Sequence, residues 1–268
     1  NVKSFFLSHG GTVGMFENWP PVTSYFVLKK KNVTYLTFSK KIKNDILRIG
    51  KKLKNTLKVD FVPNHNHLDF LSKSNFPRKV SKIAYFFSPI YGVYESKSGL
   101  HHDLEIDFFR RRLFSFFENQ KNLRVNCKLY NINSIPKSII NLLKKTKNVK
   151  IIPKKKILSK IFNDNDLIIT EVNSTTLVEA QYSKKLVLSL VKKFPKIKHD
   201  VKRKLLKRVF LTYDEKSFYK KIFELLNKKF LNKNDKKLLF NNDFLKSYYS
   251  FDDFNKEFII KKFKKILD

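Results

Sequence analysis

The sequence contains little cysteine, glycine or methionine, and it has no long apolar runs. The single cysteine among 268 residues, Cys127, excludes an internal disulfide framework, and it sits in an apolar alternation typical of a small core residue. No stretch of 18 apolar residues occurs, so no segment is expected to span a membrane, and no signal peptide pattern opens the chain. Because the chain starts at Asn1 and runs directly into a strand-like segment, we expect further sequence before it.

Glycine is scarce, and its distribution is informative. Three of the six glycines fall at positions 10, 11 and 14, directly after His9 and a strand-like run. Gly10 and Gly11 can let the backbone turn with positive φ and let a ligand approach closely. His9 is then a candidate general base at the carboxyl end of a strand, where α/β sheets place their ligands; the alternative is a plain glycine turn with an incidental histidine. Glu17 can orient His9 or contact an acceptor, or it is a surface residue.

The positive charge is large but dispersed. The net charge is +34, yet only eight of the 57 cationic residues are arginine. Arginine is the side chain better suited to recognising bases in nucleic-acid grooves and to binding phosphates through two hydrogen bonds. The lysines are spread along the chain and are not gathered in one arm. We therefore expect no nucleic-acid partner and favour attraction to an anionic membrane surface.

Short apolar runs alternate with helical patterns along the chain. Strands are expected at 4–8, 33–38, 59–62, 82–88, 123–129, 149–152, 167–170, 186–191 and 209–212. Helices are expected at 41–54, 104–117, 137–145, 156–162, 175–182, 198–207 and 215–227, and an amphipathic pair at 243–267. This alternation predicts an α/β fold, with a Rossmann-like parallel sheet and helices on both faces.

The stretch from 166 to 180 carries the strongest functional signal. A buried strand ends at Glu171, a short run of polar residues follows, and a helix begins near Thr175. The first turn of a helix has unpaired N–H groups and a positive dipole end, which together bind phosphate. The hydroxyls of Ser174, Thr175 and Thr176 can add donors, and Glu171 can accept hydrogen bonds from sugar hydroxyls. The alternative is that Asn173 or Ser174 only caps the helix.

Other polar positions are weaker candidates. Ser88 ends a strand ahead of a glycine-containing loop, where a donor phosphate can meet the backbone, and a plain loop explains it equally well. His65 and His67 lack a third metal ligand, so a polar turn is the better interpretation. Asp103 is expected to cap a helix after two exposed histidines. No metal is expected in the site.

Two elements together resemble a known family. The His-Gly-Gly-x-x-Gly loop at 9–14 and the Asn-Ser-Thr-Thr element at 173–176 resemble GT-B glycosyltransferases of bacterial surface polysaccharide biosynthesis, in particular a group of surface-carbohydrate transferases. Residues 9–10, 63–66 and 171–174 are also similar to motifs of the CDP-glycerol glycerophosphotransferases of teichoic acid synthesis. Against the latter, Glu-Val-Asn replaces Asp-Tyr-Ser at 171–173, and no Trp precedes His9.

The resemblance implies the C-terminal, donor-binding half of a GT-B fold. Residues 1–75 would be the end of an N-terminal acceptor domain and a linker, 76–235 the nucleotide-donor domain, and 236–268 helices that cross back. His9 would be the general base or an acceptor contact, while Glu171, Ser174 and Thr175 would hold the donor's ribose and phosphate.

The expected function is transfer of a sugar from a nucleotide-activated donor to a surface glycan or lipid-linked acceptor, without a cofactor or metal. We expect a cytoplasmic protein that can lie on the inner face of the membrane. Two alternatives remain open: a CDP-glycerol-type polyol-phosphate transferase, and a non-enzymatic basic protein that binds membrane or nucleic acid.

Overall fold

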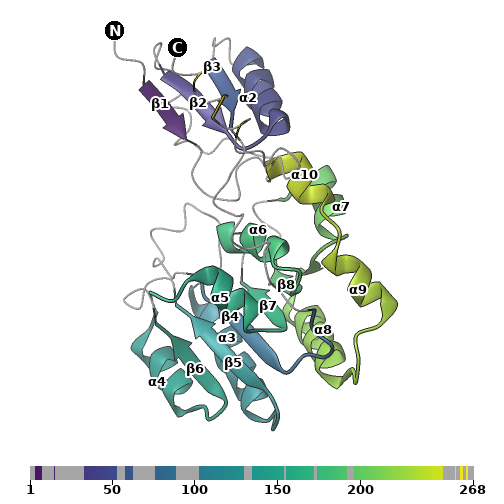
Figure 1. The fold of residues 1–268 in the computed structure, drawn as a ribbon. Helices are drawn as coiled ribbons and strands as arrows, with labels where there is room; N and C mark the ends of the chain where they lie inside the picture. Colours follow the sequence, from purple (N-terminus) through teal and green to yellow (C-terminus); the bar gives the residue numbers. More distant parts are fainter. Residues whose placement is uncertain are drawn as a thin grey trace.

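The protein contains two parallel sheets connected by packed helices (Figure 1). The structure, a computed structural model, describes residues 4–7, 15, 33–52, 58–62, 76–88, 103–129, 135–153, 155–171, 174–191 and 196–249, with positions 257, 260, 261 and 264.

The small sheet has the order β1-β2-β3, and the large sheet has the order β6-β5-β4-β7-β8-β9. The strands of the small sheet are β1 (Ser4–Leu7), β2 (Val33–Thr37) and β3 (Lys58–Phe61). Those of the large sheet are β4 (Lys82–Phe86), β5 (Arg124–Lys128), β6 (Val149–Ile152), β7 (Leu167–Thr170), β8 (Leu186–Leu190) and β9 (Phe210–Thr212). Every strand pairing in both sheets is parallel.

The described helices are α2 (Lys40–Lys52), α3 (Asp103–Glu118), α4 (Lys137–Lys145), α5 (Leu158–Asn163), α6 (Thr175–Tyr182), α7 (His199–Leu205), α8 (Glu215–Asn227), α9 (Lys233–Leu239) and α10 (Asp243–Tyr249). From β4 to α8 the described helices alternate with the strands, and α9 and α10 follow α8. In none of these helices is there a stretch that is both long enough and apolar enough to cross a bilayer.

Helices cover both faces of the large sheet, because side chains alternate along each strand. On β4, Ile83 and Tyr85 pack with α3, α4 and α8, while Ala84 and Phe86 pack with α5 and α6 on the other face. Burial on both faces explains why the central strands read as continuous apolar runs. The expected class, an α/β fold with a Rossmann-like parallel sheet and helices on both faces, is therefore confirmed.

The helix α2 packs on the small sheet through a short apolar stripe. Ile42 and Ile46 lie one turn apart and are both buried, as an amphipathic helix requires. The Ser39 hydroxyl accepts a hydrogen bond from the Ile42 N–H at 3.2 Å and so caps the start of the helix.

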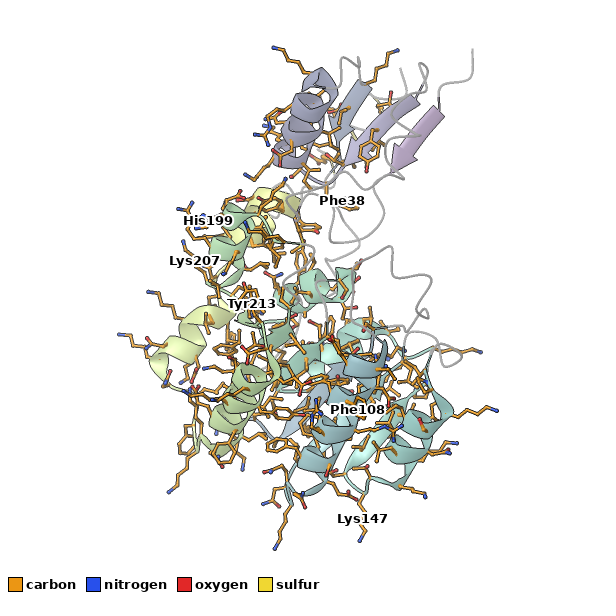
Figure 2. All side chains as sticks on the ribbon, turned by 180° about the vertical axis from the view of Figure 1, so that it is seen from behind. Phe38, Phe108, Lys147, His199, Lys207 and Tyr213 are labelled. Atoms are coloured by element: carbon orange, nitrogen blue, oxygen red, sulfur yellow. The ribbon has the colours of Figure 1, made fainter. Side chains whose placement is uncertain are left out.

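One hydrophobic core runs from the small sheet into the large one. It joins Phe38 and Ile42 to Phe244 and Tyr249 of α10, and it continues to Leu177 of α6. The rings of Phe38 and Tyr249 stack with centroids 5.9 Å apart. In Figure 2, Phe38 lies at the end of the small sheet nearest to α7 and α10, and Lys147 lies at the opposite end of the molecule. This core gives the two sheets a shared packed interior.

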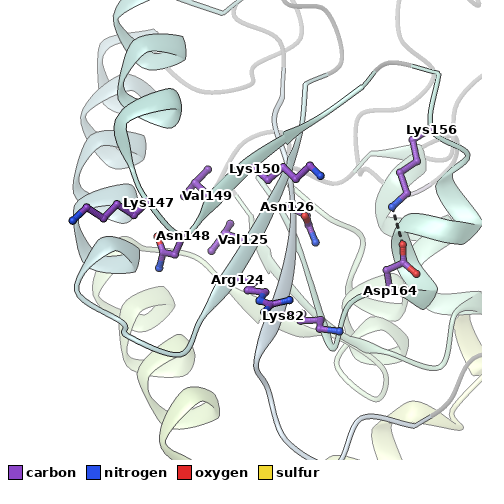
Figure 3. Close-up of a pocket in the computed structure, with 10 residues that line it drawn as sticks. All are labelled: Lys82, Arg124, Val125, Asn126, Lys147, Asn148, Val149, Lys150, Lys156 and Asp164. Carbon is purple, nitrogen blue, oxygen red and sulfur yellow. Dashed lines mark hydrogen bonds and ion pairs between the residues drawn. The ribbon is translucent and has the colours of Figure 1, made fainter.

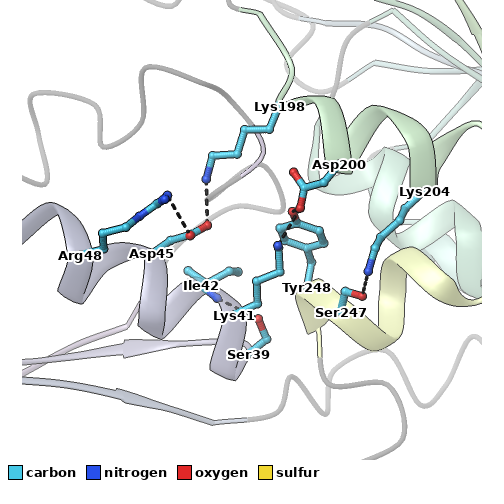
Figure 4. Close-up of polar contacts among 10 residues, drawn as sticks. All are labelled: Ser39, Lys41, Ile42, Asp45, Arg48, Lys198, Asp200, Lys204, Ser247 and Tyr248. Carbon is cyan, nitrogen blue, oxygen red and sulfur yellow. Dashed lines mark hydrogen bonds and ion pairs between the residues drawn. The ribbon is translucent and has the colours of Figure 1, made fainter.

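Ion pairs add to this apolar contact between α2 and the helices α7 and α10 (Figure 4). Lys198 pairs with Asp45 at 2.9 Å, and Lys41 pairs with Asp200 at 2.6 Å. The Tyr248 hydroxyl donates to Asp200 at 2.7 Å. Burial alone would raise the pKa of Asp200, but the bonds from Lys41 and Tyr248 outweigh it and lower this pKa to about 2. The final described helix, α10, is thus tied to both α2 and α7.

The expected elements match the structure closely, with one omission. All nine strands and the seven interior helices are present, and five elements, β6, β7, α4, α6 and α8, have the expected bounds. The sequence interpretation missed α9, and of the helix pair expected at 243–267 the structure describes α10 as a helix. The proposed domain boundaries at 75 and 235 remain predictions.

Candidate functional site

The candidate site is the carboxyl edge of the large sheet between β4 and β7. These strands are hydrogen-bonded neighbours, yet the chain leaves them toward opposite sides of the sheet, since β5 flanks β4 and β8 flanks β7. In open α/β sheets, ligands bind at the carboxyl ends of the strands where the strand order reverses. Ser88 follows β4 at this point and Glu171 follows β7, so the fold brings together two of the residues selected from the sequence.

The carboxylate of Glu171 is enclosed by protein donors. One oxygen accepts from the Tyr85 hydroxyl at 2.5 Å and the Arg110 Nε at 2.7 Å. The other accepts from the Ser88 N–H, the Ser88 hydroxyl and Arg110 Nη2, each at 2.6 Å. The side chains of Arg110 and Glu171 both have 0% exposure. The carboxylate therefore joins β7 to β4 and α3, and it can meet a ligand directly only if these bonds open.

The electrostatics of this buried cluster favour the ionised pair. Burial alone would raise the pKa of Glu171, but the Arg110 guanidinium and the donors of Ser88 and Tyr85 together lower it. Burial would likewise lower the pKa of Arg110, and the charge of Glu171 reverses this effect and raises it. The guanidinium also lies over the Phe87 ring, 4.6 Å from its centroid. Phe87 and Ser88, which directly follow β4, are thereby held by a charge pair, hydrogen bonds and a cation–π contact.

The start of α6 opens at the same edge of the sheet. Ser174 occupies the N-cap position with extended backbone, but its side chain makes no capping hydrogen bond within the described residues. The Leu177 N–H is bonded to the Ser174 carbonyl at 3.0 Å, so the N–H groups of Thr175 and Thr176 precede the helical ladder. Thr175 is exposed, and Ser174 and Thr176 are half-buried. The first turn of α6 thus reaches the surface at Thr175, and a helix start can bind an anion.

Glu179 is a candidate residue that the sequence interpretation missed. It lies one turn after Thr175 on the same helix face, and it is half-buried. No residue of the described part of the chain forms a hydrogen bond or ion pair with it. Burial raises the pKa of its carboxyl to about 7. The signal was available in the sequence, since this acid interrupts an apolar run three residues beyond Thr176.

The other end of α6 is fixed by a buried arginine. Arg208 donates to the carbonyl of Gln181 at 3.0 Å and to that of Lys185 at 3.0 Å. Its positive charge faces the negative end of the helix dipole. Burial lowers the pKa of Arg208 to about 9. The helix that carries Thr175, Thr176 and Glu179 is therefore anchored at its C-terminal end.

Several predicted site residues lie outside the described residues. These are His9, Gly10, Gly11, Glu17 and Asn173. The nearest described residue to the glycine loop is Met15, which is buried and whose carbonyl accepts a hydrogen bond from the Lys198 N–H at 2.9 Å. The roles assigned to all predicted site residues remain predictions.

An Asp-x-Asp pair at positions 164 and 166 lies at the opposite edge of the large sheet, before β7. Asp166 accepts from the Ser81 N–H, the Ser81 hydroxyl and the Lys82 N–H at 2.8–3.0 Å. Asp164 pairs with Lys156 at 2.7 Å. Within the described ranges, no group of three or more His, Cys, Asp or Glu side chains is placed to hold a metal. Both aspartates are thus engaged in protein contacts away from the candidate site.

Comparisons with known proteins identify the fold and no family. No protein-family model and no curated protein sequence matches the chain. Among solved structures, TarM is 14% identical, with 100% of this chain and 51% of TarM covered and a TM-score of 0.57. WaaG, a glycosyltransferase involved in lipopolysaccharide biosynthesis, is 11% identical over 89% of this chain and 63% of WaaG, with a TM-score of 0.52. MnaA from S. aureus, solved with UDP, is 14% identical over 87% of this chain and 60% of MnaA, with a TM-score of 0.54.

These likenesses place the chain in the fold class expected from the sequence, the C-terminal half of a GT-B structure. The chain spans between 51% and 63% of the length of the three structures. At such low identity, the similarity establishes the fold, and the function must be argued from the site itself.

Proposed function

We propose that this chain binds a nucleotide-activated sugar and acts in a glycosyltransferase that delivers the sugar to a surface glycan or lipid-linked acceptor. The observation that carries the proposal is the position of the first turn of α6, with exposed Thr175, at the switch point between β4 and β7. A helix start at that position supplies N–H groups and a positive dipole end to a diphosphate. The similar MnaA structure contains UDP, which agrees with this assignment.

Different residues of the described structure can bind different parts of the donor. Ser174, Thr175 and Thr176 surround the helix start and would donate hydrogen bonds to the phosphates. Glu179, half-buried and one turn further on, would accept hydrogen bonds from sugar hydroxyls. Because the Glu171 carboxylate is already bonded by five protein donors, we assign it a positioning role, together with Ser88.

The remaining roles follow the resemblance in the sequence. His9 would be the base or an acceptor contact, with Glu17 beside it, and Gly10, Gly11 and Asn173 would line the donor. During transfer, negative charge builds on the leaving diphosphate, and preorganised N–H and hydroxyl donors stabilise it. In this proposal the reaction needs no metal ion.

The proposal extends to the location of the protein. Phe76, Phe230 and Phe240 are exposed around a cavity of about 780 Å³ that Arg78 and Lys236 also line. Exposed aromatic rings beside cationic side chains suit the interface of an anionic membrane. We propose that this patch brings the enzyme to the cytoplasmic face of a membrane that carries its acceptor.

Calorimetric titration with UDP, GDP, CDP, CMP and CDP-glycerol tests donor binding. We expect one nucleoside diphosphate or its sugar derivative to bind, and the double variant Ser174→Ala, Thr176→Val to bind it at least about tenfold more weakly, since a hydrogen bond to a charged group contributes about 1.5–3 kcal/mol. Ser174 makes no side-chain cap bond within the described residues, so the variant should remain folded. Ser115→Ala, an exposed position on α3, is the matched control.

The outcomes separate the alternatives. Binding of CDP-glycerol alone would select the polyol-phosphate transferase. Absence of binding by every compound would refute the donor site and favour a non-enzymatic basic protein. Analysis of products with a bound sugar nucleotide then distinguishes transfer to an acceptor from a change in the donor sugar itself.

A further inference from the structure

A second cavity lies on the face of the large sheet at β5 and β6, beside α5 (Figure 3). On β5, Val125 and Cys127 point into the core beneath α3 and α4, so Arg124, Asn126 and Lys128 point to the other face. The cavity has a volume of about 510 Å³. Its polar lining residues, here called the basic groove, are Lys82, Arg124, Asn126, Lys147, Asn148, Lys150, Lys156 and Asp164.

The charges of the basic groove are unbalanced. In the described part of the chain, five cationic side chains line it, and the single carboxylate among the lining residues, that of Asp164, is bonded to Lys156 at 2.7 Å. The other four cations are exposed, and no described residue forms an ion pair or hydrogen bond with their side chains. They are Lys82, Arg124, Lys147 and Lys150. Like charges gathered in a concave surface raise the local concentration of oppositely charged ligands.

The floor of the groove is fixed by hydrogen bonds. The Asn126 amide donates to the Asn165 side chain at 2.8 Å, and Asn165 donates to the Ile161 carbonyl of α5. At the carboxyl end of β5, the Lys128 ammonium donates a hydrogen bond to the Pro153 carbonyl at 2.8 Å. The cations thus stand on a rigid sheet and helix, which reduces the entropy lost when a ligand binds.

The spread of the cations indicates the size of the ligand. Lys82 begins β4 and is paired in register with Arg124, which begins β5, and Lys147 precedes β6. Neighbouring strands are about 4.8 Å apart, so these charges extend over roughly 10 Å. A single phosphate cannot contact all of them, whereas a chain that carries several phosphates can.

The residues that line the groove also indicate which chemical groups the ligand does not contain. Among the described residues that line the cavity none is aromatic, so bases of single-stranded nucleic acid would find no ring there to stack on. The apolar lining residues, Val125 and Val149, are not exposed, and a flat membrane cannot follow a concave surface. We therefore propose that the basic groove binds a linear chain of phosphate groups without nucleobases, as a site separate from the donor site.

The position of the groove makes the proposal independent of the proposed function. Lys82 and Arg124 are the first residues of parallel strands, so this end of the groove lies at the amino edge of the sheet, opposite the start of α6. A phosphate chain bound there would leave the donor site open.

Inorganic polyphosphate labelled for fluorescence anisotropy is a suitable probe. The triple variant Lys82→Gln, Arg124→Gln, Lys150→Gln is expected to bind it at least about tenfold more weakly at low ionic strength, and the slope of log K against log salt should fall by about 2. The matched control removes the same charge from exposed lysines of the α8–α9 region, as Lys220→Gln, Lys229→Gln, Lys233→Gln. This control should bind nearly as tightly as the original chain.

Several results would overturn the proposal. These are no polyphosphate binding, equal weakening in both triple variants, or displacement of polyphosphate by an oligonucleotide at lower concentration than by unlabelled polyphosphate. Loss of binding to vesicles of anionic phospholipid in the groove variant alone would assign the groove to a membrane instead. Nucleotide binding measured separately should be the same in both triple variants, and a selective loss in the groove variant would contradict a separate site.

Discussion

Arg110→Met is expected to lower the free energy of unfolding by about 3–5 kcal/mol, because it leaves the buried Glu171 carboxylate without its charged partner. Methionine preserves much of the side-chain volume, so the loss measures the charge and its hydrogen bonds more than a cavity. Urea denaturation near neutral pH gives the free energy directly. The surviving donors, Tyr85 and Ser88, are too few to compensate a fully buried charge.

A neighbouring arginine provides the control. Arg112 pairs with Glu215 at 2.7 Å, but the side chains are 56% and 37% exposed. Exposed pairs of this kind contribute about 0–1 kcal/mol, so Arg112→Met should change stability little. Equal effects of the two substitutions on the same helix would contradict the account of the Glu171 cluster.

The same cluster sets a pH dependence with a defined sign. The pKa of Glu171 is lower in the folded chain than its ordinary value, so its contribution to stability is present above that ordinary value. The contribution is lost as the pH falls through the lowered pKa. Arg110→Met should therefore differ least from the original chain in strongly acidic solution.

Glu179→Gln is expected to stabilise the fold and to impair donor binding. Burial raises the pKa of this carboxyl to about 7, so the folded chain binds a proton that the unfolded chain releases near pH 4.5. The contribution of Glu179 to the free energy of unfolding consequently falls as the pH rises from about 4.5 to 7. Above that window the substitution should raise the free energy of unfolding by at most about 3.5 kcal/mol, since each pKa unit corresponds to about 1.4 kcal/mol.

The effect on binding has the opposite sign. If the ionised carboxylate accepts hydrogen bonds from the donor's sugar hydroxyls, Glu179→Gln should weaken sugar-nucleotide binding about tenfold or more, and binding to the original chain should tighten as the pH rises through 7. Glu118→Gln, at an exposed position on α3, should change neither quantity. Unaltered affinity in Glu179→Gln would remove this residue from the donor site, and unaltered stability would show that the carboxylate is solvated.

Local patterns of apolar and polar residues predicted the secondary structure, because they mark where strands and helices begin and end. Strand β7 and helix α6 have sharp limits, because an apolar run stops at Glu171 and polar residues precede Thr175. Helix α9 was missed because its seven residues include only two apolar side chains. A signal was present in the capping box, in which Asn232 and Asp235 each bond the other's backbone N–H.

The candidate site was only partly readable, because its contacts join distant parts of the chain. The sequence placed Glu171 at a strand tip, but its partners Arg110 and Tyr85 lie 61 and 86 residues away. Sequence periodicity carries no information about such long-range contacts. An acidic residue at the end of a strand has the same sequence pattern whether its side chain faces a ligand or the protein interior. The sequence interpretation did not single out Glu179, because the exposure of its side chain depends on how α6 packs.

The central claim is that the N-terminal turn of α6 holds the phosphates of a sugar nucleotide. Hydrogen–deuterium exchange of the segment 174–178, with and without a nucleoside diphosphate, tests it most directly, because the N–H groups of Thr175 and Thr176 precede the helical ladder. The account predicts exchange slowed at least about tenfold there, with no change in the segment 232–240. Saturating nucleotide that leaves the exchange of 174–178 unchanged would contradict it.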